Sequence, residues 1–505
     1  MVRSITYSGW TATSNAAGTV NPEGGIDPRV WKIAWVVLLG PLMTSLDATV
    51  VNVSLPALGH ALHAPLLTLQ WVITGYLLAL ALMLPLSGWL VDRAGAKRVY
   101  LISFAMFTLA SLLCGASASA PMLIAGRIFQ GMAGGLLAPM AQMMAARWAG
   151  QHISRVMGIM TMPVLLGPIV GPSLAGLILQ HASWRWIFFI NLPIGVLAVL
   201  LAALILPGDE TSSRSRDFDA LGFLLLSPGL VFLLYSLENL GASPVLRLSY
   251  VLEFAASLGL LAGFAFHARK LGAAALIDLG LFRNFSFFAS AATQFFGNAV
   301  SFGGQMLLPL YLLVVLRISP SQTGLVLASA GLGMLCSYPS MGAPTEHFGP
   351  RRTSAGGAFV ALAATLPFAL VHPSALSKWV ICAALFVRGI GMGGINLPSI
   401  HAAYTSIAKE NIPAATTTIN IVQRLGGPVA TTVLAIFLHT RTAASACASD
   451  ISHSNWSARA TSATFLLLSG FHAAAFLAAM YLPLRAQRER TAQNSDLPTT
   501  EGGAL

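Results

Sequence analysis

Long apolar runs recur along the whole chain, and they constrain its fold more than any other feature of the sequence. A helix needs about 20 apolar residues to cross a bilayer, and we expect fourteen such crossings. Membrane-spanning strands are excluded, because they would be segments of about 10 residues with strict alternation of apolar and polar positions. The expected spans are residues 31–58, 70–91, 99–118, 121–146, 156–180, 185–206, 219–240, 249–267, 286–315, 321–345, 354–371, 378–404, 412–439 and 462–484. The sequence therefore predicts an all-α polytopic membrane protein.

The composition supports this class, and the charges predict the topology. Apolar residues make up 56% of the 505 positions and charged residues only 9%, whereas charged residues account for about 25% of a soluble domain. We place 19 of the 28 lysines and arginines on one side of the membrane, 6 on the other and the remaining three inside spans. Because basic loops face the cytoplasm, both termini are expected there. The net charge of +11 is thus a topology signal, and we expect no nucleic-acid partner.

An internal duplication predicts the architecture. The segment GWLVDRAGAKR (88–98) aligns without gaps with GAPTEHFGPRR (342–352), Arg127 corresponds to Arg388, and the Gly-Pro pair 167–168 corresponds to the pair 427–428. Two six-helix halves with two inserted helices follow from this repeat. Such a duplication predicts a binding site near the midplane between halves that rock against each other. The expected divisions are a cytoplasmic tail (1–30), a first half (31–206), a linker with two helices (207–285), a second half (286–484) and a second tail (485–505).

Asp47 is a carboxylate inside an apolar span, and this makes it a functional candidate. At the centre of a helix it costs roughly 2.5–3.5 kcal/mol on insertion scales. Arg127 lies roughly 9 Å from the outer end of its span and Asp47 roughly 15 Å from that of its own, at 1.5 Å per residue. Both side chains can therefore line one cavity. Two interpretations remain open: a pair that couples transport to protons, and a static ion pair that fixes helix packing.

Several segments together resemble one family of transporters. GWLVDRAGAKR is similar to the loop signature of the major facilitator superfamily. Five further segments resemble the fourteen-helix drug:proton antiporter branch of that family. They are LDATVVNVSLPAL (46–58), QWVITGYLLALALMLPLSGWL (70–90), GRIFQGMAGG (126–135), LLGPIVGP (165–172) and WRWIFFINLPIG (184–195). The resemblance covers nearly the whole chain. It is weaker in the second half, where Glu346 and His347 stand at the positions of an Asp-Arg pair.

The resemblance implies roles for particular residues. Asp47 and Arg127 are expected to act in proton coupling. A cytoplasmic gating loop that latches in one state is expected at Gly88, Asp92, Arg93, Gly95, Lys97 and Arg98. A kinked, closely packed gate helix of the antiporter type is expected at Gly167, Pro168, Gly171 and Pro172; a generic packing kink is the alternative. The resemblance further implies export across the inner (cytoplasmic) membrane.

Polar stripes on apolar helices predict the substrate cavity. Gln294, Asn298 and Gln305 recur at helical spacing along one span, and Asn420 lies on a second stripe beside Arg424. Asn52, Tyr76 and Gln130 are assigned to the same cavity from the first half. Arg424 contacts substrate or a cavity acid in one interpretation and packs between helices in the other. The glutamates lie near helix ends, so a neutral, zwitterionic or anionic substrate is at least as plausible as a cation.

The predicted function is proton-coupled efflux of small, lipophilic compounds by alternating access. The alternatives are an exporter or importer of a specific metabolite, such as a siderophore or organic acid, and a membrane sensor that does not transport. We find no HExxH, GxSxG or nucleotide-loop motif, so no enzymatic activity is expected. No metal site and no cofactor other than the coupling proton are expected. The expected partners are a small-molecule substrate and the lipid bilayer, with room for a periplasmic adaptor and an outer-membrane channel.

Overall fold

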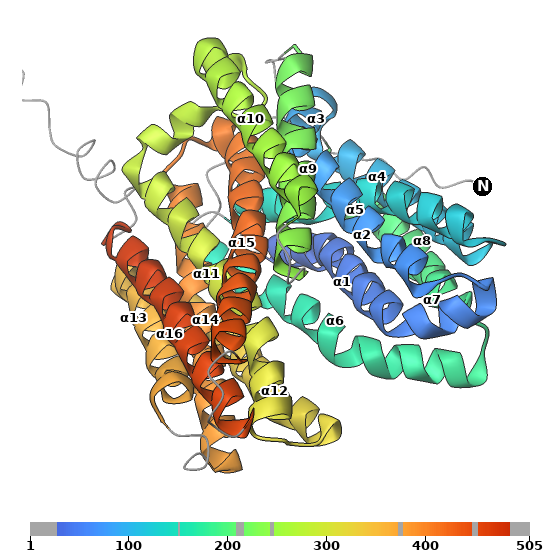
Figure 1. The fold of residues 1–505 in the computed structure, drawn as a ribbon. Coiled ribbons are helices and arrows are strands. Elements are labelled where there is room, and N and C mark those ends of the chain that lie inside the picture. Colours follow the sequence, from blue (N-terminus) through green and yellow to red (C-terminus); the bar gives the residue numbers. More distant parts are fainter. Residues whose placement is uncertain are drawn as a thin grey trace, which may run out of the picture.

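Helices form nearly all of the protein (Figure 1). The computed structural model describes residues 28–149, 152–208, 217–242, 247–371, 377–446 and 453–484, and no strand occurs within these ranges. The expected cytoplasmic tails therefore lie almost entirely outside the described residues.

Three groups of helices follow one another along the chain. The first group is α1 (Pro28–Leu62), α2 (Leu66–Met83), α3 (Leu86–Ala94), α4 (Ala96–Gly115), α5 (Ala120–Ala149), α6 (Ile153–His181), α7 (Trp186–Phe189) and α8 (Asn191–Ile205). The linker holds α9 (Ala220–Ala242), α10 (Leu248–Leu271), η2 (Gly272–Ala274) and η3 (Leu279–Arg283). The last group is α11 (Phe285–Leu310), η4 (Tyr311–Val315), α12 (Pro320–Ser340), α13 (Gly342–Leu370), α14 (Lys378–Thr405), η6 (Lys409–Asn411), α15 (Ile412–Ala446) and α16 (His453–Met480).

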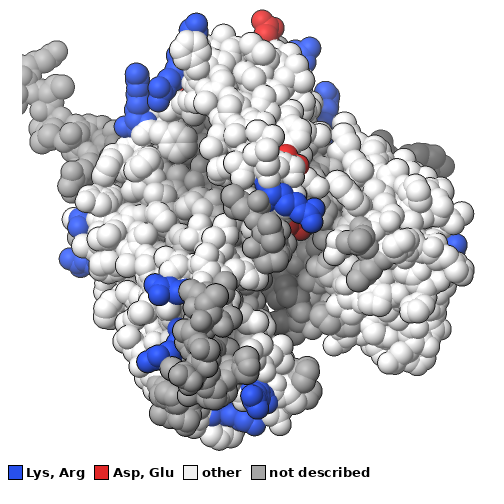
Figure 2. All heavy atoms as spheres, viewed as in Figure 1, with Lys and Arg blue, Asp and Glu red and all other residues white. Residues whose placement is uncertain are grey.

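The length and exposure of these helices confirm a polytopic membrane protein. In the described residues, ten helices are long and apolar enough to cross a bilayer, and eleven if the bent pair α2 and α3 forms one span. Large apolar side chains face outward, as at Trp379 (84% exposed) and Leu204 (82% exposed). In Figure 2 the charged side chains are few: many lie near the outline, and one mixed group of basic and acidic side chains lies near the centre of the view. The total of fourteen crossings and the orientation stay predictions.

One expected span is not a continuous helix. Residues 70–91 were predicted as a single crossing, but α2 and α3 are bent by 54° at a break between Met83 and Leu86. Pro85 lies in this break. Proline lacks a backbone N–H and clashes with the preceding turn, so a helix is interrupted there. The apolar pattern continues through the break, which is why hydropathy alone did not show it.

The internal duplication is visible in the backbone of the two repeated loops. Gly95 has φ 87° and ψ 152°, and its counterpart Gly349 has φ 82° and ψ 161°. Side chains other than hydrogen rarely tolerate such positive φ angles. In both halves the glycine separates the end of one helix from the start of the next, so the repeat preserves a chain reversal that needs glycine.

The two halves meet at the end of the molecule that carries both repeated loops. The Gly88 backbone lies against Thr417 and Pro413 of α15, and Gly342 lies against Arg155 of α6. In Figure 1, α6 and α12 meet at one end and diverge toward the other. Figure 2 shows a notch between the halves on the side where these two helices diverge. The structure is therefore closed at the end with the loops and open toward the other end.

Helix α9 of the linker contacts both halves. On the first half, Trp71 of α2 stacks on Tyr235 of α9, with ring centroids 6.1 Å apart. On the second half, the Thr432 hydroxyl of α15 donates to the Leu237 carbonyl of α9 at 2.7 Å. Helix α9 thus packs along the seam between α2 and α15, and α10 packs on α9.

Candidate functional site

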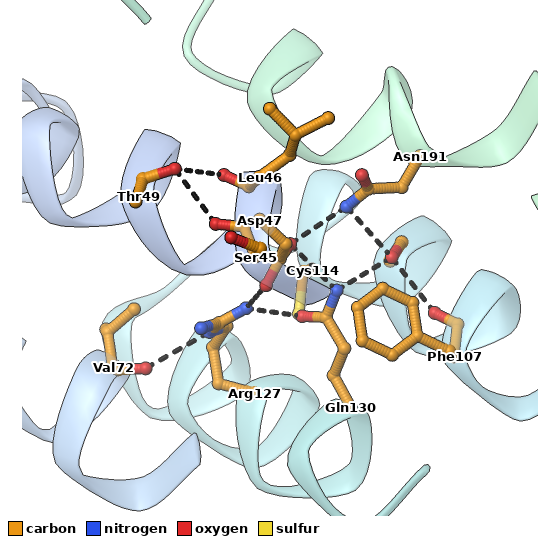
Figure 3. A network of polar contacts seen from close by, with 11 residues as sticks. Ser45, Leu46, Asp47, Thr49, Val72, Phe107, Cys114, Arg127, Gln130 and Asn191 are labelled. Carbon is orange, nitrogen blue, oxygen red and sulfur yellow. Dashed lines mark hydrogen bonds and ion pairs between the residues drawn. The ribbon is translucent and has the colours of Figure 1, made fainter. Parts of the chain in front are cut away.

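A buried ion pair joins Asp47 of α1 to Arg127 of α5 (Figure 3). Arg127 Nη1 lies 2.5 Å from Asp47 Oδ2. The Arg127 side chain is 1% exposed and the Asp47 side chain is 0% exposed. Arg127 Nε also donates to the Val72 carbonyl of α2 at 3.1 Å. The structure thus joins Asp47 and Arg127 in one buried pair, while a shared cavity and their part in proton coupling stay predictions.

Three further polar side chains complete the surroundings of the carboxylate. Asp47 Oδ1 accepts hydrogen bonds from Gln130 Nε2 (3.0 Å) and Asn191 Nδ2 (2.8 Å). Ser111 of α4 accepts from the same two amides, at 2.8 Å and 3.4 Å, and donates to the Phe107 carbonyl. Gln130 Oε1 accepts from Arg127 Nη1 at 2.7 Å and from the Cys114 thiol. Helices α1, α2, α4, α5 and α8 thus converge on a single carboxylate.

Tyr76 of α2 packs against this network at Arg127. Its ring is 4.1 Å from the Arg127 guanidinium carbon, a cation–π distance. Tyr76 is 2% exposed, and its hydroxyl has no hydrogen-bond partner among the described residues. It was assigned to the substrate cavity, whereas the structure places it against the arginine of the ion pair. Movement of Tyr76 would therefore change its contact with the Arg127 guanidinium.

This arrangement suits a carboxylate that changes its charge. A buried pair loses several kcal/mol of solvation and persists only when its hydrogen bonds are satisfied. Here the ionised form of Asp47 has three donors, and Arg127 has two further acceptors in Val72 and Gln130. Protonation would remove the ion pair while leaving Arg127 its two neutral acceptors. The site can therefore exist in two charge states without an unbonded guanidinium.

The expected gate helix, α6, packs closely on the helix that carries Asp47. A side-chain carbon on Gly167 would meet Ser45, and one on Gly171 would meet Thr49. The Thr49 hydroxyl reaches across to the Gly167 carbonyl at 3.2 Å. The two glycines therefore permit close contact between α1 and α6, as expected. The side chains of Pro168 and Pro172 lie outside the described residues, and the gating role stays a prediction.

The gating-loop residues divide between two kinds of contact. Gly88 lies at the interface between halves, and the adjacent Ser87 hydroxyl is 2.8 Å from that of Thr417. Lys97 instead donates to the Ala203 and Leu206 carbonyls at 2.8 Å and 2.6 Å, at the end of α8 in its own half. Asp92 is half-buried, while Arg93 and Arg98 are exposed.

The weaker second loop also joins the halves. Glu346 lies 3.5 Å from Arg155 Nη2 and 3.3 Å from His152 Nδ1, both in the first half. Glu346 occupies the repeat position of Asp92. The departure from the family pattern at this position therefore keeps a charged contact between halves.

The residues assigned to the cavity lie in several places. Gln130 belongs to the Asp47 network and is fully buried. Gln294 is also fully buried and donates to Asn396 and Ser399 of α14, so it joins helices within the second half. Asn298 is half-buried beside Gly427, and Gln305 and Asn52 are exposed. The helical stripe thus covers a helix–helix contact and an open region.

Asn420 and Arg424 lie where α15 faces the first half. Asn420 donates to Gln142 of α5 at 2.7 Å, across the interface. Arg424 is half-buried and one turn further along α15. It makes no hydrogen bond or ion pair within the described part of the chain, in contrast to Arg127. The packing interpretation of Arg424 therefore lacks a bonded partner.

Comparison with known proteins agrees with this architecture. The family model described as Major Facilitator Superfamily matches residues 37–431. The chain belongs to the major facilitator superfamily. Two solved structures share its fold. A double tryptophan mutant of XylE, a proton:xylose symporter of the same superfamily, has a TM-score of 0.63 with 14% identity over 92% of this chain and 98% of its own. The human organic anion transporter MFSD10 has a TM-score of 0.61 with 15% identity over 90% of this chain and 100% of its own.

Sequence relatives within the superfamily carry multidrug-resistance names. The multidrug resistance protein B homolog of Mycobacterium tuberculosis is 35% identical over 416 residues, which are 82% of this chain and 77% of the relative. The putative multidrug resistance protein MdtD of Klebsiella pneumoniae is 32% identical over 366 residues, 71% and 76% of the two chains. These relatives support the predicted resemblance to the drug-exporting branch of the superfamily.

Sequence reasoning missed Asn191 and Ser111, and it did not connect Gln130 to Asp47. Asn191 is the side-chain amide within WRWIFFINLPIG, a motif noted only for its resemblance. A buried amide at the start of an apolar helix is itself a signal, because buried polar groups in proteins are generally hydrogen-bonded. Which group it bonds to depends on how α8 packs against α1 and α4.

Proposed function

We propose that this major facilitator protein exports small, lipophilic compounds across the cytoplasmic membrane in exchange for protons. The observation that carries the proposal is the buried Asp47–Arg127 pair, with Tyr76 packed on the guanidinium. Ionisable side chains inside a membrane protein commonly mark proton or substrate pathways. The multidrug-resistance names of the relatives support export as the direction of transport and drugs as the class of substrate.

In this mechanism Asp47 alternates between two bonded states. The ionised carboxylate holds Arg127 Nη1 and the amides of Gln130 and Asn191. A proton on Oδ2 neutralises the carboxyl, ends its electrostatic attraction for Arg127 and leaves the guanidinium to Val72 and Gln130. Tyr76, stacked on Arg127, moves with it. Protonation at Asp47 thereby changes the wall of the site that faces the second half.

The conformation supports an outward-open state. The halves are held together at the end with the repeated loops, through Ser87 with Thr417 and through Glu346 with Arg155. With the orientation predicted from the charges, this closed end faces the cytoplasm. Protons would then enter from outside, where a membrane potential contributes about 2.3 kcal/mol per charge per 100 mV. One proton per cycle can drive strong accumulation of substrate outside.

The proposal needs no cofactor besides the coupling proton. The small-molecule substrate and the bilayer are its required partners, and an adaptor and outer-membrane channel are compatible with it. A specific metabolite on the same scaffold would leave the Asp47 mechanism intact and change only the substrate.

The test is proton movement in proteoliposomes with an acid interior. A panel of cationic, neutral and anionic compounds is added to wild type, Asp47→Asn and the control Glu410→Gln, which removes an exposed carboxylate. We expect some compound to release protons through wild type and Glu410→Gln but not through Asp47→Asn.

Each other outcome has a definite meaning. Equal proton release from all three proteins would place the proton site elsewhere and overturn the role of Asp47. Compound binding without proton movement in any of them would replace antiport by uniport or by sensing.

A further inference from the structure

We propose that Arg424 is the docking point for an anionic group of the substrate, so that the preferred compounds are lipophilic molecules with a carboxylate. This inference rests on the proposed function, since it names the class of compound exported. Relatives with multidrug-resistance names do not indicate such a preference.

The first argument is the position of Arg424 on α15. Pro413, Thr417, Asn420 and Arg424 follow at spacings of 4, 3 and 4, so they lie on one face of the helix. Pro413 and Thr417 contact Gly88, and Asn420 bonds to Gln142, all in the first half. Arg424 is the next residue on this face, one turn beyond the last of these contacts toward the open end. It therefore lies beyond these contacts between the halves, on the side away from the repeated loops, and its side chain is only half-buried there.

The second argument is the absence of a counter-charge. Arg424 has no hydrogen bond or ion pair within the described residues, although it is half-buried inside a spanning helix. Charged side chains within membrane segments nearly always pair with another group. A half-buried guanidinium that has no partner among the described residues is thus suited to a partner that arrives from outside the protein. A carboxylate fits best, because it can accept two parallel hydrogen bonds from the guanidinium.

The third argument is the charge balance of the interior. Far from helix ends, the described spans of the two halves hold one acid, Asp47, and three arginines, at 127, 388 and 424. Asp47 is already bonded to Arg127, and Arg388 donates to the Val300 carbonyl with no acid beside it. The midplane is therefore positive overall. It favours an anionic group and disfavours a doubly charged cation.

The fourth argument links this point to the proton site. Arg424 lies within electrostatic range of the Tyr76 hydroxyl across the interface. The ring of Tyr76 rests on Arg127, which is bonded to Asp47. An anion on Arg424 is thus separated from Asp47 by two side chains. Occupancy by substrate and by proton can therefore influence each other electrostatically, with Tyr76 and Arg127 lying between the two sites.

The experiment compares binding of two probes that differ in one group. The probes are a rhodamine with a free benzoate carboxylate and the methyl ester of the same dye, titrated by fluorescence anisotropy into protein in lipid nanodiscs. Wild type is expected to bind the free acid at least about tenfold more tightly than the ester, because a charged hydrogen bond supplies that difference. Arg424→Gln should bind both dyes equally. Arg424→Lys should keep part of the preference.

The controls separate recognition from folding and from antiport. Arg283→Gln removes an exposed arginine and should keep the full preference for the acid. Arg424→Gln should unfold at the same temperature as wild type or higher, because it breaks no bond within the described structure. Proton movement is recorded on the same proteins, so an acid preference without proton movement would overturn antiport and leave the docking point standing.

Three results would overturn the assignment. They are equal binding of acid and ester by wild type, failure of wild type to bind the acid, and an undiminished acid preference in Arg424→Gln.

Discussion

Removal of the Asp47 carboxylate should cost less stability when Arg127 is neutralised at the same time. In Asp47→Ala the guanidinium stays buried, at 1% exposure, and keeps only the neutral acceptors Val72 and Gln130. Breaking a buried pair by removing one partner typically costs about 3–5 kcal/mol. The amides of Gln130 and Asn191 add little to this cost, since both still reach Ser111.

The double variant shows whether the two charges are coupled. Arg127→Gln alone leaves a buried carboxylate without its cation and should also cost about 3–5 kcal/mol. If the losses were additive, Asp47→Ala with Arg127→Gln would lose about 6–10 kcal/mol. Because it leaves no buried charge, we expect it to lose no more than either single variant, a coupling energy of about 3 kcal/mol or more.

The assay is equilibrium unfolding in mixed micelles, followed by tryptophan fluorescence. The control cycle pairs Asp47→Ala with Arg352→Gln, an exposed arginine in the second repeated loop, and should be additive. Additive losses in the Asp47 and Arg127 cycle would refute the ion pair. The double variant also separates the two interpretations of the pair, since a static pair predicts recovered transport along with recovered stability. Proton coupling predicts a stable protein that moves no protons.

Three further predictions concern other parts of the fold. Gly171→Ala should lower stability by about 1–3 kcal/mol because its new carbon meets Thr49, whereas Gly176→Ala, which meets nothing within 4 Å, should have no such cost; thermal unfolding of both variants checks this. Glu346→Gln should increase the population open at the loop end by up to about fivefold, as expected for a partly exposed ion pair worth about 0–1 kcal/mol; distances between spin labels on α6 and α13 measure it, and an unchanged distribution would exclude a latch. Burial raises the pKa of the Asp219 carboxyl, just before α9, but hydrogen bonds from the Gly222 amide, His267 and the Leu276 amide outweigh burial and hold this pKa below 3.8. Asp219 therefore stabilises the folded state above pH 3.8, and this stabilisation disappears as the pH falls through its lower folded-state pKa. Asp219→Asn should accordingly be less stable than wild type at neutral pH and equally stable in strong acid, as followed by unfolding at several pH values.

The sequence by itself determined the membrane class, the internal repeat and the two central charges. Hydropathy reports helices because crossing a bilayer requires a minimum apolar length. The repeat can be recognised in the sequence because its loops need glycine at a fixed position, as at Gly95 and Gly349. Asp47 and Arg127 stand out because charges are costly in apolar spans.

Only the tertiary structure decided which side chains meet. Asn191 and Asp47 are separated by 144 residues, and Asp47 and Arg127 by 80, so the contacts depend on helix packing and not on local periodicity. The same holds for the end at which the halves close and for the lack of a bonded partner for Arg424 among the described residues. A polar stripe shows that a helix face is not suited to lipid, but Gln294 and Arg424 show that such a face can meet another helix or an open space. Through-space packing separates these cases because a hydrogen bond requires its partners within about 3 Å, a distance that spacing along one helix does not specify.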